Sequence, residues 1–260
     1  MTQQNHDIDT AAARRTLVGE RDLFAPSELF HENSKITASA AHFTLGAAAQ
    51  SVSARGFKRF QHAQGEPLPP PSPAGSGVAA AIAARRSCRM FDGRRLALSD
   101  LSDLLFLMGG SPAPGRRCAP SAGGLYPLDL YLAAGRVEGL EPGVLHHDPL
   151  GHALTRLSWA DPLPAIRDAV FIPEALDGAA AVILISAVFG RSKIKYGERA
   201  YRFALIEAGH AMQNLLLAAT ERGLGTCPVG GFIDDRLHDL IAVDGVEEAV
   251  LYLAILGHPA

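Results

Sequence analysis

Small and apolar residues recur at helical spacing in three segments of the chain. Residues 77–87 are rich in alanine and predict a short helix. Ser99 is placed to cap a second helix, which Gly109 and Gly110 would end. Residues 196–222 predict one long helix with a face of small residues, spaced three or four apart and suited to close packing. That face comprises Ala204, Ala208, Ala211, Leu215 and Ala218.

Four other runs predict strands. LDLYLAA at 128–134, AAAVILISAVF at 179–189 and AVLYLAILG at 249–257 are apolar and of strand length, and VLHHD at 144–148 predicts a further short strand. The helices and strands alternate without the regular spacing of βαβ units. We therefore predict a mixed α+β fold rather than a doubly wound parallel sheet.

The beginning of the chain differs from the rest. Residues 1–66 are polar and weakly periodic, and they lead into EPLPPPSPAGSG, whose prolines force an extended path. We place the start of the main domain at about Gly75. Residues 1–74 are then an N-terminal extension with a Pro-rich linker, and residues 75–260 are the folded domain.

Composition and charge narrow the class of protein. The chain has 260 residues, of which 48% are hydrophobic, enough for a sizeable core, and its net charge of −3 argues against a nucleic-acid binder. Its three cysteines are too scattered for a disulfide framework, and its ten histidines form no HExxH, so we expect no metal site. The chain starts without a signal-peptide profile, and its longest apolar stretch is well short of the roughly 20 residues of a membrane helix. We expect a soluble, cytoplasmic protein with no membrane partner.

A basic cluster follows the first predicted helix. Arg85, Arg86 and Arg89 lie within five residues, with Ser87 between them. Guanidinium groups bind phosphate in a bidentate manner, and a serine hydroxyl adds a further donor. The same pattern is typical of a solvated basic helix end, which the helix dipole favours. The residues alone leave both interpretations open.

Two turns rich in small residues are further candidates. They are Pro120, Ser121, Ala122 and Gly123 before one strand, and Val229, Gly230 and Gly231 after an extended segment. Glycine and small side chains let backbone N–H groups approach a ligand closely, so a planar ring would fit either turn. A plain turn explains each of them equally well. The chain has neither a GxGxxG nor a GxxxxGK[ST] signature, so the usual nucleotide-binding motifs give no support.

Polar residues interrupt the long predicted helix and precede it. Those within it are Glu207, His210, Gln213 and Asn214. Buried polar groups need partners, and we interpret these as packing or interface groups rather than catalysts. Lys195 and Tyr196 stand at the helix entry, where an amine and a phenol can position and transfer a proton. A surface lysine beside a half-buried tyrosine is the commoner arrangement, so their role stays open at this point.

Five segments together resemble the FMN-dependent nitroreductase superfamily. In chain order they are RRSCRMF, PSAGGLYPLDLY, KYGERAYRFALIEAGHAMQN, GLGTCPVGGF and LYLAILGHP. They are most similar to its SagB-type branch, which includes the azoline dehydrogenases that form thiazoles and oxazoles, and FHENSK at 30–35 is similar to the opening of many SagB-type chains. The resemblance spans residues 76–257. It implies a nitroreductase-like α+β fold with a central, mostly antiparallel sheet flanked by helices, in an intertwined homodimer with two flavins at its interface.

The resemblance also implies roles for the candidate residues. Residues 85–89 would bind the phosphate and ribityl chain of FMN, residues 120–123 would contact the flavin ring from the other subunit, and residues 229–231 would bring a backbone N–H to flavin N5. Lys195 and Tyr196 match a Lys-Tyr pair that is implicated in proton removal by azoline-oxidising members. The predicted long helix would contribute to the dimer seam through its small-residue face.

Two features of these residues qualify the implied site. Many relatives carry a basic residue after the last strand, whereas residues 258–260 here are His-Pro-Ala, so we expect phosphate binding to rest mainly on residues 85–89. Lys195 is a poor base in water, because a lysine pKa of about 10.4 keeps it protonated. Burial against the flavin, or the proximity of Arg199 and Arg202, would lower the pKa of Lys195.

The function implied is that of an FMN-dependent oxidoreductase. Its most specific form is the two-electron dehydrogenation of a thiazoline or oxazoline on a peptide or natural-product intermediate, with other biosynthetic enzymes as further partners. The first alternative is a reductase that passes electrons from NAD(P)H to nitro compounds or quinones. The second is a non-catalytic subunit of a biosynthetic complex. Failure to take up FMN would exclude both enzymes, and bleaching of the flavin by NAD(P)H would favour the reductase.

Overall fold

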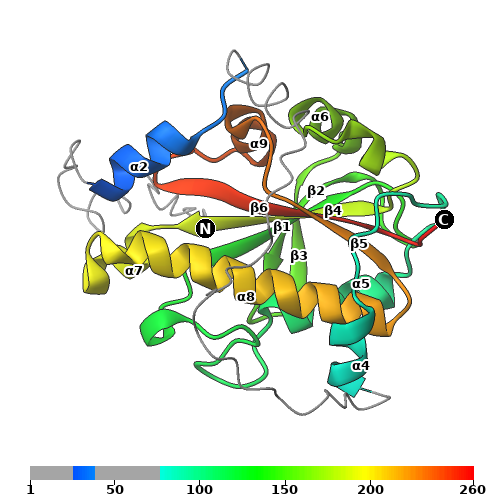
Figure 1. Cartoon of the computed structure of the whole chain (residues 1–260), viewed down its shortest axis with the longest axis horizontal. Coiled ribbons are helices and arrows are strands. Elements are labelled where there is room, and N and C mark those ends of the chain that lie inside the picture. Colours follow the sequence, from blue (N-terminus) through cyan, green and yellow to red (C-terminus); the bar gives the residue numbers. More distant parts are fainter. Residues whose placement is uncertain (1–25, 39–76) are drawn as a thin grey trace, which may run out of the picture.

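A mixed sheet-and-helix architecture forms the described part of the protein. In the computed structural model, residues 26–38 and 77–260 are described, and they form a six-stranded sheet with helices on both faces (Figure 1). The strand order is β3-β2-β1-β4-β6-β5, and all neighbouring strands are antiparallel. The strands are β1 (Leu128–Ala134), β2 (Gly143–Asp148), β3 (Ala153–Ser158), β4 (Ala181–Val188), β5 (Gly225–Val229) and β6 (Glu248–Gly257). The predicted α+β fold with an antiparallel sheet is confirmed.

The position of each strand in the sheet explains whether the sequence pattern predicts it. Residues 181–185 of β4 have no exposed surface, because β4 lies in the middle of the sheet and is covered on both faces. A strand of this kind is a continuous apolar run. Neither edge strand was among the predicted strands. On β3 every second residue is exposed, and β5 contains Pro228, which is tolerated at an edge because its missing N–H breaks no ladder hydrogen bond.

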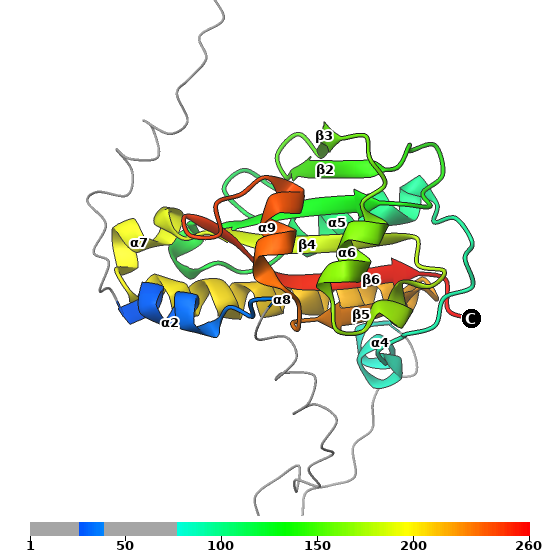
Figure 2. The same ribbon diagram turned by 90° about the horizontal axis from the view of Figure 1, so that it is seen from above.

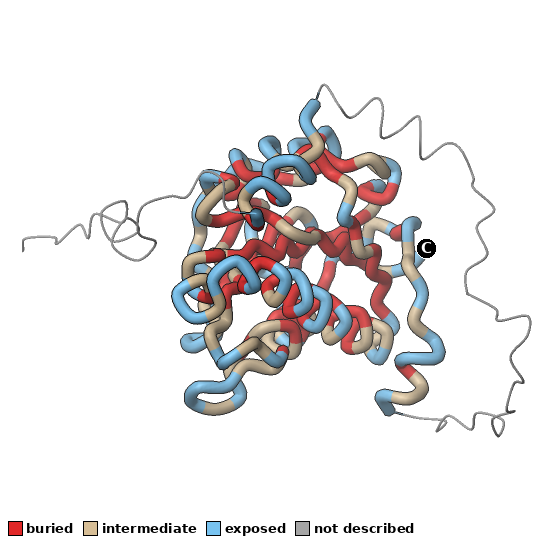
Figure 3. Tube along the Cα trace, turned by 60° about the vertical axis from the view of Figure 1, so that its left-hand side comes forward, coloured by how far each residue is buried: buried red, intermediate tan, exposed pale blue. Residues whose placement is uncertain are grey.

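Helices cover the two faces in separate groups. The helices are α2 (Pro26–Ser34), α4 (Gly77–Ala84), α5 (Leu98–Gly109), α6 (Leu163–Ala169), α7 (Gly190–Tyr196), α8 (Arg199–Glu221) and α9 (Asp234–Ile241), with short 3-10 helices at Ala122–Gly124 and Pro173–Leu176. The helices α5 and α8 pack on one face and form one core with it, and α6 and α9 pack on the other (Figure 2). Buried residues accordingly run through the strands, and exposed residues follow the outer turns of the helices (Figure 3).

Two helix predictions need correction. Ser99 is not the N-cap of α5, because the helix begins at Leu98 and Ala97 occupies the cap position without a side-chain hydrogen bond. The end of α5 at Gly109 agrees with the sequence, and the Gly110 N–H donates to the Phe106 carbonyl. The predicted long helix at 196–222 is α8, which begins three residues later at Arg199, whereas the separate short helix α7 before it was not predicted. The two helices are separated at Gly197, whose φ of 52° is a conformation that glycine adopts far more readily than other residues.

The small-residue face of α8 packs inside the protomer. Ala204, Ala208 and Ala211 are buried against the sheet, so the prediction that this face serves a dimer seam is wrong. The opposite face carries Leu205 and Ile206, which are 41% and 50% exposed.

Part of the N-terminal region also packs on this domain. The helix α2 lies along α7 and the beginning of α8 (Figure 1). The Pro-rich linker and the proposed boundary at Gly75 lie outside the described residues. Within the described ranges, every helix is too short or too polar to cross a membrane.

Candidate functional site

The arginine cluster (Arg85, Arg86 and Arg89) lies against the beginning of β5. The Cys88 N–H donates to the Thr226 carbonyl at 2.8 Å, and Ser87 pairs with Thr226 in a parallel bridge. A Cβ on Gly225 would lie 2.8 Å from Cys88 Sγ, so Cys88 points inward and needs a glycine opposite. Because side chains alternate along an extended segment, Ser87 and Arg89 project to the side opposite Cys88.

The charge of the arginine cluster is not neutralised by the chain. Among the residues that the structure describes, no carboxylate forms an ion pair with any of the three guanidinium groups, and the nearby Asp92 pairs with Arg94 instead. Arg85 is half-buried, whereas the other two arginines are exposed. The last residues run beside this segment, since the Ala260 N–H donates to the Met90 carbonyl. The cluster is therefore available to an anion.

The 229–231 turn lies at the far end of β5. Because β5 is an edge strand, one of its sides has no neighbouring strand. From Thr226 to Gly230 the strand extends by about 13 Å at the usual rise per residue. A Cβ on Gly231 would lie 3.1 Å from the Phe171 ring, and Gly230 is exposed. The arginine cluster and the exposed Gly230 thus lie at the two ends of one edge strand, whose own residues are mostly buried.

Lys195 and Tyr196 lie directly on the Gly123 turn (residues 120–124). Gly123 has a φ of 63°, and a Cβ there would come within 2.5 Å of Tyr196 Oη and 2.9 Å of Lys195 Nζ. The Tyr126 N–H donates to Ser121 Oγ at 2.9 Å and helps to fix the turn. The Tyr196 ring is half-buried, but Lys195 is exposed, so the burial that we expected for this lysine is not found in the single protomer.

Glu207 lies behind the same turn. Its side chain is buried, and its Oε2 has no hydrogen-bond partner. Burial raises the pKa of Glu207 to about 7, while the Ser121 hydroxyl and the Arg117 guanidinium oppose the rise. Sequence reasoning interpreted this residue as a packing group. The one signal of its position was a carboxylate at an inward-facing point of an apolar helix.

The other polar residues of α8 behave differently. Asn214 is half-buried and donates to the Leu107 carbonyl at 3.2 Å, as expected of a packing group. His210 and Gln213 are exposed and belong to the outer face of the helix. Within the described residues, no group of three or more His, Cys, Asp or Glu side chains could hold a metal ion.

The Lys-Tyr pair and the arginine cluster lie at opposite ends of α8, because α7 precedes its beginning and the start of β5 follows its end (Figure 1). Lys195, Tyr196 and the Gly123 turn lie at its beginning, and the arginine cluster lies beyond its end, against β5. Between Glu207 and Glu221 alone the helix rises by about 20 Å. One protomer therefore brings neither group to the other.

The pKa of Glu207 predicts how stability depends on pH. A glutamate pKa of about 7 in the folded state lies above the usual unfolded value near 4.3, so the folded state binds the proton more tightly. The free energy of unfolding should then fall as pH rises from about 4 to 7. Glu207→Gln removes this titration, and we expect it to stabilise the protein at pH 8 by on the order of 1 kcal/mol. Urea unfolding at pH 5 and pH 8 measures the effect, and equal pH dependence in both proteins would contradict the assignment.

Comparison with known proteins agrees with these features. The model of the Nitroreductase family matches residues 82–258. A protein named for the nitroreductases, MJ1384 of Methanocaldococcus jannaschii, is 34% identical over 160 residues, which are 61% of this chain and 81% of that protein. The microcin B17-processing protein McbC of Escherichia coli is 29% identical over 173 residues. That match covers 64% of each chain, so it spans less than two thirds of McbC.

A solved structure extends the likeness to the whole fold. A chain of the Escherichia coli microcin synthetase complex McbBCD superposes with a TM-score of 0.70, covering 98% of this chain and 99% of that one at 22% identity. This likeness shows the fold. The resemblance drawn from the five motifs is confirmed, and the match to McbC agrees with its SagB-type branch. The family model covers well over half of the sequence, and the chain belongs to the nitroreductase family.

Proposed function

We propose that the protein is a SagB-type, FMN-dependent dehydrogenase that oxidises a thiazoline or oxazoline ring on a peptide or natural-product intermediate. The observation that carries this proposal is the position of Lys195 and Tyr196 on the Gly123 turn. The amine and the phenol pack directly on the backbone of this turn, in the space that a side chain at Gly123 would otherwise take. The match to McbC, a protein named for the processing of a peptide, supports the substrate class.

The residues present fit FMN. The arginine cluster and Ser87 would hold the phosphate. The guanidinium groups of the cluster have no acidic partner among the described residues, and the segment that carries them lies beside the edge strand β5. The backbone of the 229–231 turn would meet the ring. Bound there, FMN supplies a two-electron acceptor for hydride, and molecular oxygen would take the electrons onward as hydrogen peroxide.

The proposed chemistry needs one proton acceptor from the chain. Converting an azoline to an azole removes two hydrogens from adjacent ring carbons, one as hydride and one as a proton, and the released C–H electron pair becomes the new ring double bond. Tyr196 or Lys195 would take that proton, and the tyrosine would be held by its edge-on contact with Phe203, at 5.0 Å between ring centres. Lys195 Nζ lies over the tyrosine ring, 5.3 Å from its centre, and the exposed amine would pass a proton on to solvent.

A complete site would need two chains. We propose a homodimer in which the Gly123 turn of one chain meets the arginine cluster and β5 of the other. The outer face of α8 is suited to the seam. Gly209 lies in the middle of this face, and a Cβ there would meet no atom of residues 26–38 or 77–260 within 4 Å. A glycine in mid-helix destabilises the helix by about 0.5–1 kcal/mol relative to alanine. Close approach of a second chain would explain why glycine occupies this position.

Association with other biosynthetic proteins forms a further part of the proposal. The McbBCD structure is a complex with a truncated pro-MccB17 bound, and its chain shares this fold. An enzyme that oxidises azolines also requires a partner activity that closes the ring by removing water from a Cys-, Ser- or Thr-containing peptide.

Substitution of the Lys-Tyr pair tests the reaction. Lys195→Ala and Tyr196→Phe should each lower azoline oxidation by about 10²–10⁴-fold, the range of a positioned acid or base. FMN stoichiometry should stay the same, because both variants keep the arginine cluster and the 229–231 turn that would hold the cofactor. Oxidation of an accepted azoline at the wild-type rate by both variants would overturn the assignment. A wild-type protein that rejects azolines and reduces nitroarenes with NAD(P)H would be the alternative reductase.

Substitution within the arginine cluster tests the cofactor site. A charge-assisted hydrogen bond contributes about 1.5–3 kcal/mol, so Arg89→Ala should weaken FMN binding about tenfold or more. Fluorescence titration of the apoprotein with FMN measures the affinity. Arg94→Ala is the matched control, because Arg94 lies close by in the chain but pairs with Asp92. Equal affinities for all three proteins would exclude the cluster as the phosphate site.

Substitution on the outer face of α8 tests the dimer. Gly209→Glu should suit the helix of the protomer but place two like charges in the proposed seam. Sedimentation should then show a monomer with weak FMN retention, where the wild type sediments as a dimer. Thr155→Glu adds the same charge at an exposed position on β3 and should leave the dimer unchanged. A Gly209→Glu protein that stays dimeric and retains FMN would place the seam elsewhere.

A further inference from the structure

The helix α2 contacts the chain on both sides of Lys195 and Tyr196. Glu28 Oε1 lies 2.7 Å from the Nζ of Lys193, two residues before Lys195. The Ser27 N–H donates at 2.7 Å to Oε2 of Glu198, two residues after Tyr196. Lys193 Nζ and Glu198 Oε1 are 3.7 Å apart and close the network. The first turn of α2 therefore binds the two residues that flank the segment 195–197.

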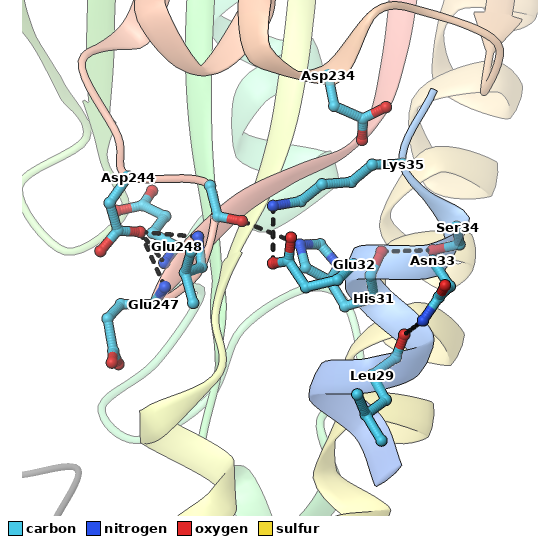
Figure 4. Close-up of polar contacts among 12 residues, drawn as sticks. Leu29, His31, Glu32, Asn33, Ser34, Lys35, Asp234, Asp244, Glu247 and Glu248 are labelled. Carbon is cyan, nitrogen blue, oxygen red and sulfur yellow. Dashed lines mark hydrogen bonds and ion pairs between the residues drawn. The ribbon is translucent and has the colours of Figure 1, made fainter. Parts of the chain in front are cut away.

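A buried histidine anchors α2 in this position. His31 is only 6% exposed, and its Nδ1 lies 3.0 Å from the Tyr201 hydroxyl on α8. Its Nε2 lies 3.1 Å from the Gly245 carbonyl, which acts as the acceptor. Figure 4 shows His31 pointing from α2 toward the turn that carries Asp244 and Glu248. Burial lowers the pKa of His31 and so favours the neutral ring, whose Nδ1 can accept a hydrogen bond from the Tyr201 hydroxyl.

The helix α7, which carries Lys195 and Tyr196, needs such contacts. It has seven residues, and isolated helices of this length are unstable in water. At its beginning, Arg191 donates to both carboxylate oxygens of Asp129 on β1, at 3.0 and 2.7 Å. At its end, Gly197 interrupts the connection to α8. The direction of the second half of α7 is therefore set by side-chain contacts, and those from α2 reach it.

We infer that α2 is a positioning element for the proton-transfer pair, with Glu28 acting through Lys193 to hold Lys195 and Tyr196 on the Gly123 turn. This inference rests on the proposed function of that pair. Glu28 is a positioning residue, since its carboxylate contacts Lys193 and neither Lys195 nor Tyr196. The FHENSK motif thereby acquires a physical role, because it contains the His31 anchor.

A charge exchange between α2 and α7 tests the inference in the full-length FMN-loaded protein. Glu28→Lys and Lys193→Glu each replace an attraction with a repulsion, and each should lower kcat for azoline oxidation by about 10- to 100-fold, as expected for a small misplacement of reacting groups. The double variant reverses the pair and should recover most of the wild-type kcat. Glu28→Gln, a milder change, should give a smaller loss if the single reversals fold poorly.

Two readouts and a control variant separate positioning from general damage. Hydrogen exchange of the amides of residues 190–198 should be faster in each single variant than in the wild type. In the double variant the exchange rate should return to the wild-type value. Re-oxidation of the chemically reduced flavin by a quinone requires no protein base, so its rate should stay at the wild-type value. Glu32→Lys is the control on the same helix, because Glu32 pairs with Lys35 and not with α7, and it should leave kcat and exchange unchanged.

The outcomes distinguish this inference from the proposed function. If the wild type oxidises azolines and Glu28→Lys does so at the same rate with the same exchange, the positioning role is excluded and the proposed function stands. If the single variants lose activity but the double variant recovers neither activity nor the wild-type exchange rate, the Glu28–Lys193 ion pair does not position Lys195 and Tyr196, and the inference fails. If the wild type oxidises no azoline, the proposed function fails, and unchanged exchange in Glu28→Lys would overturn the contact between α2 and α7 as well.

Discussion

The close packing of α8 on the sheet determines where the candidate residues lie. Ala204, Ala208 and Ala211 have almost no side chain, so the helix lies close to the sheet along the middle of its length. It begins at the Gly123 turn and ends where the arginine cluster meets β5. Around Gly209, no other element among the described residues covers its opposite face, and a second chain would approach there. The placement of both groups, and the face left for assembly, follow from this one contact.

Much of the fold could be predicted from local patterns, and the exceptions have physical reasons. The strands β1, β4 and β6 are visible because central strands are apolar on both sides. The strand β5 is less visible because Pro228 is acceptable only at an edge, and no local pattern says where the edge is. The short helix α7 was missed because Ile194 is the only aliphatic residue in it, so it shows no apolar periodicity. The inward face of α8 was misassigned because alanine suits packing on a sheet and packing on a second chain equally well.

The candidate site was predictable in its parts but not in its assembly. The motifs identified the arginine cluster, the two turns and the Lys-Tyr pair, and the contact of Tyr196 with Gly123 joins two of these segments. The raised pKa of Glu207 was not foreseen, since the environment of this carboxylate is made by a turn more than eighty residues earlier in the sequence. The polar contacts between α2 and α7 were not foreseen for the same reason. Contacts between distant segments depend on the fold, and sequence patterns describe mainly neighbours.

The separation of the two groups along α8 has a genetic consequence. In the proposed dimer, each site takes its phosphate-binding residues from one chain and its proton-transfer pair from the other. A chain defective at Arg89 and a chain defective at Lys195 would then assemble into a mixed dimer with one doubly defective site and one intact site. The two lesions lie in a single gene, yet they would complement each other, as lesions in different genes do. A cell that carries one copy of each lesion would therefore keep part of the activity that a cell with two copies of the same lesion loses.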